Sequence, residues 1–428
     1  DATSGSVRGG CRGIHNCIGS GATSQNKRIS NMSQFSTLTP MPADALLGLM
    51  TAYREDPRDE KFDLGVGVYK NDKGETPVMS AVAKAEALIL KSQTTKVYEG
   101  PRGNTDYCAA IEGFVFGEGA AATQEGRTLS FTAPGGCGAL FLGTGLMSRM
   151  GVKTVWVSNP TWPNHPNVVR FMGLDVAEYP YADPETGELD LAAMLAGIEK
   201  AERGDGIIIQ GPCHNPTGID LTIEDWKKVG ALVKSKGLIA MLDVAYHGFA
   251  KGLDEDVKGV RAFIEAAGEA LVSYSCSKNF GLYRERAGCF LAVGESAEGI
   301  AAASTHVAAL ARASYSMPPA HGAAIVATIL NNADLRAEWE AELTQMRERM
   351  TSLRKALAET LVEKTGSNRL GAVAMQNGMF SQLPLSKDGI TAMREKSGLY
   401  MPNSGRINIA GLNLKDIPAV ADIIAKEA

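Results

Sequence analysis

The sequence predicts an α/β protein with a mostly parallel central sheet covered by helices, together with a smaller α+β domain. Short, almost wholly apolar runs recur along the chain with helical stretches between them; the runs are Val152–Ser158, Gly206–Gln210, Leu238–Leu242 and Ala270–Ser275. Strands that are buried on both faces of a parallel sheet have this composition. Each run also ends in polar or turn-forming residues, at the edge where such sheets bind their ligands.

The composition of the 428-residue chain is that of an ordinary globular enzyme, with 44% hydrophobic and 21% charged residues. A net charge of −5 argues against a nucleic-acid-binding protein, which would carry a basic surface. No uncharged apolar stretch is long enough to cross a bilayer. The seven cysteines are scattered without a CxxC pair, and the histidines lack metal-ligand spacing. We therefore expect neither a disulfide framework nor a metal site.

Residues 1–31 differ in composition from the rest of the chain. They are rich in glycine and serine and carry four basic residues and one acid. This composition overlaps with that of an organellar transit peptide, but no apolar helical face accompanies it and Met32 follows as a natural start. We therefore favour a disordered tag or upstream-translated leader on a cytoplasmic protein. Import into an organelle is the alternative if residues 1–31 are a transit peptide.

Two domains are predicted in the remaining sequence, of which the larger covers residues 76–331 and holds the sheet. The smaller combines residues 32–75 and 332–428. A long helical stretch rich in Glu, Arg and Leu, Asn331–Thr365, leads from one to the other. The other expected elements are helices over Met41–Tyr53, Val78–Ser92 and Leu414–Ala428, and strands over Leu64–Tyr69, Met379–Leu383 and Arg406–Ala410.

The segment Ser273–Gly288 carries the residues that point most directly to chemistry. Lys278 lies just past an apolar strand, where partial desolvation would lower its pKa and give an amine nucleophile able to form a Schiff base. Beside it, Ser275, Ser277 and Arg286 suit a dianionic phosphate. An amine for an aldehyde and a cradle for a phosphate are what pyridoxal phosphate requires. Taken alone, however, a lysine in this position is more often an ordinary surface lysine after a strand.

Other candidate ligands follow the other apolar runs. Asp243 could keep a cofactor's ring nitrogen protonated, although an acid at a strand end is often a helix cap. Asn215 and Tyr246 could donate to a phenolate oxygen, and Trp162 could stack on a ring or simply pack in the core. Arg406, among apolar neighbours on a C-terminal strand, needs an anionic partner such as a substrate carboxylate.

Two glycine-containing segments could bring backbone N–H groups close to a ligand. Gly136 and Cys137 open a helix, and small residues there expose the positive end of the helix dipole to an anion. Gly67 interrupts the run Leu64–Tyr69, where a glycine either admits a ligand or forms a bulge.

Eight short motifs lie between about Met41 and Ala428, in the order and at the spacing of a known enzyme family. They are LGVGVYK (64–70), TTKVYEG (94–100), NPTWPNH (159–165), HNPTG (214–218), LDVAYHGF (242–249), SCSKNFGLYRER (275–286), ARASYSMPPAHG (311–322) and NGMF with SGRINIAG. Each motif alone is weak, but the set is specific. With them the chain resembles the class I aminotransferases of the aspartate and aromatic amino acid group, which are fold-type I pyridoxal-phosphate enzymes.

The resemblance implies a role for each candidate. Lys278 would hold the cofactor and then move a proton between it and the substrate α-carbon, while Asp243, supported by His165, would pair with the ring nitrogen. Asn215 and Tyr246 would bind the phenolate oxygen. The remaining roles would be ring stacking by Trp162, phosphate binding by Gly136, Cys137, Ser275, Ser277 and Arg286, and binding of the substrate α-carboxylate by Gly67 and Arg406.

The resemblance also implies an obligate homodimer with shared active sites. Tyr98 would reach the phosphate from the neighbouring subunit. Arg312, also from the neighbour, would pair with the distal carboxylate of aspartate, glutamate or 2-oxoglutarate. Amino acids and 2-oxo acids would be the substrates.

Four positions depart from the family pattern. Cys137 stands where Ser or Thr is usual, which weakens or removes one phosphate hydrogen bond, and His247 replaces a common Gln. Val97 and Met317 stand where aspartate-restricted members have Asn, and this loss of polar groups should favour aromatic substrates. Arg312 is retained, so dicarboxylic substrates should still bind. We therefore expect transamination between aromatic amino acids (Tyr, Phe, Trp), aspartate or both, and 2-oxoglutarate. A strict aspartate aminotransferase is the alternative.

A more distant alternative rests on two short motifs. Ser275–Lys278 matches SxxK and Lys364–Gly366 matches KTG, as in penicillin-binding acyl-serine hydrolases. That class needs SxxK at a helix start, KTG on a strand and an SDN triplet, and the sequence offers none of these settings. A nicotinamide-linked dehydrogenase is disfavoured because no GxGxxG follows a strand. Arg312 and Arg406, one for each carboxylate, favour transamination over a lyase or β-decarboxylase on the same scaffold.

Overall fold

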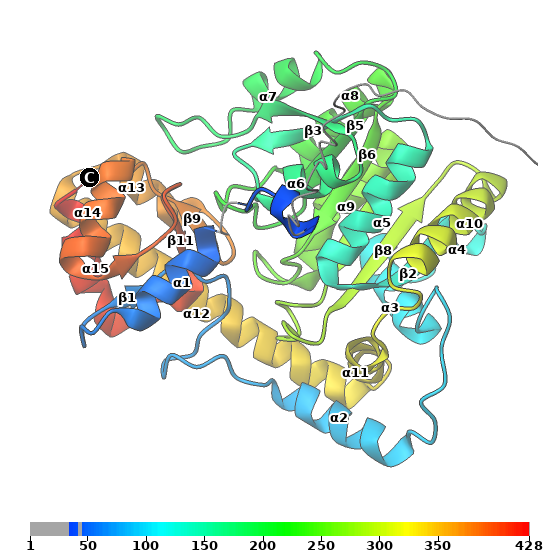
Figure 1. The fold of residues 1–428 in the computed structure, drawn as a ribbon, viewed down its shortest axis with the longest axis horizontal. Coiled ribbons are helices and arrows are strands. Elements are labelled where there is room, and N and C mark those ends of the chain that lie inside the picture. The colour runs from blue at the N-terminus through cyan, green and yellow to red at the C-terminus, as the bar shows by residue number, and fades with distance from the viewer. Residues whose placement is uncertain (1–33, 42–44, 428) are drawn as a thin grey trace, which may run out of the picture. The chain divides into compact units, whose positions relative to one another are not determined.

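The computed structural model of the protein describes residues 34–41 and 45–427. The chain divides into two compact units, Asp1–Ala43 and Asp44–Ala428. The described part of the first unit holds a short 3₁₀-helix, Gln34–Thr37. The prediction for residues 1–31 lies outside the described residues. The second unit holds the sheet and the helices around it (Figure 1).

Seven strands form the central sheet in the described part of the second unit, in the order β2-β8-β7-β6-β5-β3-β4. Adjacent strands are parallel except at β8, which runs antiparallel to both β2 and β7. The predicted mostly parallel sheet is therefore confirmed. Its strands are β2 (Thr128–Pro134), β3 (Thr154–Asn159), β4 (Asp175–Pro180), β5 (Gly206–Gln210), β6 (Ile239–Val244), β7 (Ala270–Ser275) and β8 (Ala287–Val293).

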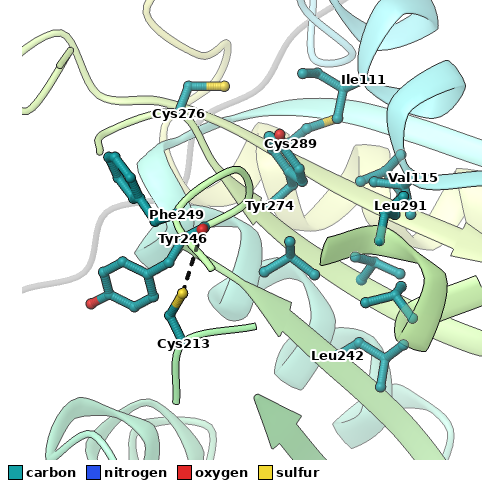
Figure 2. Packing of buried hydrophobic residues seen from close by; sticks show 14 of the residues in the cluster. Ile111, Val115, Cys213, Leu242, Tyr246, Phe249, Tyr274, Cys276, Cys289 and Leu291 are labelled. Carbon is teal, nitrogen blue, oxygen red and sulfur yellow. Dashed lines mark hydrogen bonds between the residues drawn. The ribbon is translucent and has the colours of Figure 1, made fainter. Parts of the chain in front are cut away.

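Alternate residues of the central strands face two separate cores, as expected for a sheet that is covered on both sides. In β5, Ile207 and Ile209 belong to one hydrophobic cluster and Ile208 to the other. Figure 2 shows part of the first cluster, in which Val115 packs with strand residues such as Leu291. The first cluster includes residues of α2 (Ser80–Ser92), α3 (Thr105–Phe116), α7 (Leu191–Ile198), α8 (Ile223–Lys236), α9 (Leu253–Ala267) and α11 (Ala320–Leu330), and the second those of α5 (Gly135–Arg149), α6 (Asn164–Phe171) and α10 (Ala297–Ser314).

Local sequence sets where these helices begin and end. Helix α8 begins at a capping box, in which Thr222 Oγ1 accepts a hydrogen bond from the Asp225 N–H and the Asp225 carboxylate accepts one from the Thr222 N–H. It ends at Gly237, which adopts a left-handed φ of 66°. Helix α5 follows β2 without a loop, because Gly135 has a φ of 69° that turns the chain at the strand end.

A third hydrophobic cluster lies in the C-terminal part of the second unit. Helix α12 (Ala333–Thr365) contributes Trp339 to the first cluster and Leu353 and Leu361 to the third. Strand β9 (Phe380–Gln382) pairs antiparallel with β11 (Arg406–Asn408), and β1 (Phe62–Asp63) pairs parallel with β10 (Leu399–Tyr400). The remaining helices are α1 (Ala45–Glu55), α4 (Ala121–Gln124), α13 (Asn368–Gly371), α14 (Lys387–Ser397) and α15 (Ile417–Ala425), with 3₁₀ turns at Ala372–Met375, Ile409–Gly411 and Leu414–Asp416. The division into domains at residues 75/76 and 331/332 stays a prediction.

The strand predicted over Leu64–Tyr69 is wrong. Strand β1 ends at Asp63, whose Oδ1 accepts hydrogen bonds from the N–H groups of Gly65 (3.0 Å) and Val66 (3.3 Å) and so turns the chain. The strand predicted over Arg406–Ala410 is shorter than expected for the same kind of reason, because Asn408 Oδ1 accepts a hydrogen bond from the Ala410 N–H. In the described part of the chain, no helix is both long enough and apolar enough to span a membrane.

Candidate active site

A cavity of about 220 Å³ lies at the carboxyl ends of β5, β6 and β7. Most of the predicted site residues meet in it. It is lined by Gly67, Gly136, Cys137, Trp162, Asn215, Asp243, Tyr246, Ser275, Ser277, Lys278, Arg286 and Arg406, and also by Leu46, Leu140, Gln210, Ala245 and Phe380. The predicted residues Tyr98 and Arg312 are not among its lining residues.

Lys278 follows strand β7, every residue of which is buried, and is itself partly buried. Its Nζ lies 5.6 Å from the centre of the Tyr246 ring. Burial lowers the pKa of Lys278, the nearby cations Arg286 and Arg406 lower it further, and the Asp243 carboxylate acts in the opposite direction. The lowered pKa makes the neutral amine, the form that can act as a nucleophile or accept a proton, more accessible than in an ordinary lysine.

Asp243 is held by a buried hydrogen-bond chain. Its Oδ2 lies 2.9 Å from His165 Nε2, and His165 Nδ1 lies 2.9 Å from Thr161 Oγ1. Because Thr161 Oγ1 accepts a hydrogen bond from Gln210 Nε2 (3.4 Å), its hydroxyl is free to donate to His165 Nδ1. The His165 Nε2–H then points at Asp243, which fixes the carboxylate at the cavity wall.

Beside Lys278, the start of α5, the hydroxyls of Ser275 and Ser277 and the Arg286 guanidinium together form an anion cradle. Arg286 Nη1 donates to Ser277 Oγ (3.4 Å) and to the Tyr283 carbonyl (3.1 Å). Arg286 also lies over the start of α5: a Cβ at Gly135 would stand 2.3 Å from Arg286 Nη2, so only glycine admits the guanidinium there. A helix N-terminus, two serine hydroxyls and a guanidinium are together suited to a dianion.

Cys137 stands in the first turn of α5, at the edge of this cradle. Its Sγ accepts a weak hydrogen bond from Asn164 Nδ2 at 3.6 Å. The thiol therefore occupies the place where a hydroxyl would bind an anion more strongly, since sulfur is a poor hydrogen-bond donor.

Arg406 is a buried cation without a carboxylate partner among the described residues. Its Nη2 donates to the Gly65 carbonyl at 2.7 Å, its Nη1 lies 3.5 Å from Asn215 Oδ1, and its buried Nε has no hydrogen-bond partner. The guanidinium also lies over the Phe380 ring, 4.5 Å from its centre. Burial lowers its pKa. Such a group can gain a large stabilisation from an incoming carboxylate.

Asn215 and Tyr246 face each other across the cavity wall. Asn215 Nδ2 donates to Tyr246 Oη at 3.3 Å. The Asn215 backbone is clamped by Gln210, whose Oε1 accepts from the Asn215 N–H and whose Nε2 donates to the Asn215 carbonyl, both at 2.9 Å. Burial raises the pKa of Tyr246, so its hydroxyl stays protonated and can donate a hydrogen bond.

Gln210 and Phe380 are site residues that sequence reasoning missed. Gln210 is the polar last residue of the otherwise apolar strand β5, which is a signal that could have found it. Phe380 gave no such signal, because an apolar residue in a short strand is ordinarily core. His247, by contrast, lies away from the cavity: its Nδ1 contacts Tyr274 Oη at 2.9 Å and its Nε2 the Leu253 carbonyl at 2.7 Å.

The predicted partner-derived residues lie on the surface of the single chain. The Tyr98 side chain is 86% exposed, and Val97 beside it is 73% exposed. Arg312 is exposed near the end of α10, where it donates to Ser316 Oγ.

Trp162, in contrast, lines the cavity, and its ring meets the His165 ring edge to face at 5.3 Å between ring centres.

Comparison with known proteins identifies the family. The model of the class I and II aminotransferases matches residues 59–424. Aspartate aminotransferase of Salmonella typhi is 44% identical over 391 residues, covering 91% of this chain and 99% of that protein. Aromatic-amino-acid aminotransferase of Paracoccus denitrificans is 43% identical over 389 residues, covering 90% of this chain and 98% of that protein.

A solved structure agrees with these sequence relatives. The aromatic-amino-acid aminotransferase of Burkholderia pseudomallei, covalently bound to pyridoxal phosphate, has a TM-score of 0.89 and 35% identity, covering 92% of this chain and 99% of that one. These similarities confirm the resemblance and the fold class that were predicted from the motifs. The chain belongs to the family of class I and II aminotransferases.

Proposed function

We propose that this aminotransferase uses pyridoxal phosphate to exchange an amino group between aromatic amino acids or aspartate and 2-oxoglutarate. The observation that carries the proposal is the meeting of Lys278, the Asp243–His165 pair, the Arg286 cradle and the incompletely bonded Arg406 in one cavity. The relatives named for aspartate, tyrosine and aromatic amino acids support the substrate range. The Burkholderia pseudomallei structure supports the cofactor.

The residues present fit pyridoxal phosphate. The cradle at the start of α5 suits its phosphate, Lys278 can supply the amine for its aldehyde, and Asp243 faces the same cavity as an acceptor for a protonated ring nitrogen. When bound, this cofactor supplies an electron sink for the electron pair left as the substrate Cα–H bond breaks.

The roles of the chain's own residues follow from their positions. Lys278 Nζ would take up the proton from the substrate α-carbon and pass it on to the cofactor. Tyr246 Oη and Asn215 Nδ2, which lie together at the cavity wall, would donate to the cofactor's phenolate oxygen, and Trp162 would offer a flat face to its ring. Arg406, with the Gly67 backbone beside it, binds and orients the substrate α-carboxylate.

A homodimer with shared active sites is part of the proposal. The loop that holds Val97 and Tyr98 leaves both side chains largely exposed, and Leu90 nearby is 83% exposed. An apolar surface of this kind is usual where a second subunit packs. Tyr98 and Arg312 then reach the neighbouring cavity, at the phosphate and at the distal carboxylate of a dicarboxylic substrate. A cytoplasmic location, or organellar import if residues 1–31 are a transit peptide, is also part of the proposal.

No observation favours the acyl-serine hydrolase. Ser275 ends strand β7 and Lys278 follows it, whereas SxxK would have to open a helix. Lys364 lies in the last turn of α12 and pairs with Asp422 at 2.6 Å, so KTG does not lie on a strand. The substrate alternative, a strict aspartate aminotransferase, is decided by the experiment below.

An absorbance spectrum of the protein loaded with pyridoxal phosphate, taken before and after each amino donor, tests the proposal. We expect a visible band from the bound cofactor that shifts to shorter wavelength with phenylalanine and, in a separate sample, with aspartate. The K278A variant is the control and should give no such shift with either donor. A shift with aspartate alone would leave a strict aspartate aminotransferase, and no band in the loaded wild-type protein would overturn the cofactor assignment.

A further inference from the structure

We propose that Asp220 is a positioning residue that holds Asn215 and the β9–β11 strand pair in register, and so sets the geometry of the carboxylate site at Arg406. The inference rests on the proposed function, because it takes Asn215 and Arg406 as ligand-binding residues. Asp220 itself does not line the cavity.

The Asp220 carboxylate joins two segments that are far apart in the sequence. Its Oδ1 accepts hydrogen bonds from the N–H groups of Cys213 (2.7 Å) and His214 (3.3 Å), in the loop that carries Asn215. Its Oδ2 accepts one from Asn377 Nδ2 (3.0 Å), just before β9. One side chain therefore bonds both the loop after β5 and the segment that enters β9.

The loop held by Asp220 has a backbone that needs support. Cys213 has a φ of 67°, a left-handed conformation that non-glycine residues adopt at a cost. The two N–H groups fixed by Asp220 are those of this residue and the next. Asn215 follows directly, so the orientation of its side chain depends on this turn. Figure 2 shows Cys213 against the Tyr246 carbonyl, which ties the turn to the other cavity wall.

The same loop lies in close contact with the segment Asn377–Phe380. The Asn377 N–H donates to the Gly218 carbonyl at 2.7 Å, and a Cβ at Gly218 would stand 2.5 Å from the Phe380 carbonyl oxygen. A Cβ at Gly378 would stand 2.3 Å from the Cys213 Cβ. The two segments are packed without room for a side chain between them, so a shift of one displaces the other.

These contacts connect the Asp220 side chain to the carboxylate site by two routes, through the loop that carries Asn215 and through strands β9 and β11. Phe380 in β9 is paired with Asn408 in β11, two residues beyond Arg406. Arg406 Nη1 lies 3.5 Å from Asn215 Oδ1, and Asn215 belongs to the loop that Asp220 holds. Asp220–Asn377 and Asn215–Arg406 are thus two side-chain links across one interface. Loss of the first link would alter the second.

The ionisation of Asp220 helps to distinguish its role in positioning Asn215 from a role in stabilising the folded protein. Burial raises its pKa to about 6, although the N–H donors of Cys213 and His214 and the amide of Asn377 favour the carboxylate. Because this pKa lies above the ordinary value of 3.8, keeping the carboxylate ionised near neutral pH costs folding free energy. A neutral replacement that retains the hydrogen bonds is therefore expected to leave the melting temperature unchanged or higher.

The test compares D220A, D220N and N377A in the full-length protein loaded with pyridoxal phosphate. The KM and kcat for aspartate and 2-oxoglutarate, the absorbance spectrum of the bound cofactor and the melting temperature are measured. D183A is the matched control, because Asp183 also accepts a backbone N–H in a turn, that of Glu185, but its turn is exposed and outside the cavity.

D220A removes the hydrogen bonds of Asp220 to Cys213, His214 and Asn377. It should raise KM for both substrates about tenfold or more, with a smaller fall in kcat, because binding at Arg406 is disturbed in ground and transition states alike. It should also shift the cofactor band, because Asn215 moves. D220N should recover most of this loss, since its amide oxygen can still accept at Cys213 and Asn377 can turn its own amide oxygen to the new donor. N377A should give an intermediate KM, and D183A the wild-type values.

A folded D220A protein with wild-type KM values and spectrum would overturn the inference. It would also be overturned if D220N were as impaired as D220A, or if D183A were impaired equally. Should D220A fail to fold, N377A decides: a wild-type KM for both substrates rejects the link, and a raised KM supports it. A wild-type protein that does not transaminate would instead reject the proposed function, which is a separate result.

Discussion

At the scale of single residues, the cavity has an excess of positive charge. Lys278, Arg286 and Arg406 line it, whereas Asp243 is the one carboxylate among its lining residues in the described part of the chain. Asp243 is already hydrogen-bonded to His165. The positive excess suits two anionic groups, a phosphate at Arg286 and a carboxylate at Arg406.

The lowered pKa of Lys278 has a measurable consequence for stability. Between its folded-state pKa and the unfolded-state value of 10.5, the unfolded chain binds more protons at this residue, so unfolding becomes harder as pH rises through that window. We expect the difference in free energy of unfolding between cofactor-free wild type and K278M to change in favour of wild type as pH rises. Denaturant unfolding of both proteins across this range checks it. A difference independent of pH would show that the pKa is not lowered.

At the scale of elements, the start of α5 depends on one glycine. Gly135 combines a φ of 69° with a position directly under the Arg286 guanidinium. Helix α5 can therefore begin at the end of β2, with the Gly135 N–H bonded to the Arg286 carbonyl at 2.9 Å and the positive end of the helix turned toward an anion. Strand, turn, helix and arginine act here as one anion-binding unit.

G135A should displace Arg286 and raise the dissociation constant for pyridoxal phosphate about tenfold or more, since a charge-assisted contact to the phosphate is worth about 1.5–3 kcal/mol. Spectroscopic titration of the cofactor-free protein measures this. G151A is the control, because Gly151 also has a positive φ of 88° but a Cβ there would meet nothing within 4 Å. That variant should lose about 1 kcal/mol of stability from backbone strain and keep its cofactor affinity. Equal cofactor binding by both variants would contradict the prediction.

At the scale of the whole molecule, the single chain leaves its predicted site incomplete. Tyr98 and Arg312 lie on the surface and outside the lining of the chain's own cavity. The proposed homodimer places each of them beside the cavity of a second subunit. Activity would then depend on two chains at every site, which a mixing experiment can measure.

Mixed dimers of K278A and R312A should recover activity that neither variant has alone. In the hybrid, the chain with intact Lys278 receives an intact Arg312 from its partner, so one of its two sites is complete. Random exchange makes about half of the dimers hybrid, and therefore about one quarter of wild-type activity with aspartate and 2-oxoglutarate is expected. Activity that stays at the level of the separate variants after verified exchange would place Arg312 in the same chain's site or outside the site.

The elements that could be predicted from sequence are those whose pattern is local. Strands β5 and β7 have the predicted bounds, because each is a short apolar run between turn-forming residues. Strand β8 was not predicted, although all its residues are buried. Its antiparallel position between β2 and β7 is set by pairing with other strands, which an apolar run by itself does not reveal. The strand over Leu64–Tyr69 failed because a single side chain, Asp63, turns the backbone.

The sequence by itself determined the family, the mostly parallel α/β fold and the identity of most residues that line the cavity from the strand ends. It could do so because apolar strands, the polar residues that end them and the spacing of motifs are properties of the local chain. Only the tertiary structure decided which distant groups touch: Arg406 with Asn215, Phe380 under the guanidinium, and Asp220 with Asn377. The contacts Arg406–Asn215 and Asp220–Asn377 depend on how the β9–β11 strand pair packs against the loop after β5, and packing between segments more than 150 residues apart leaves no local pattern in the sequence.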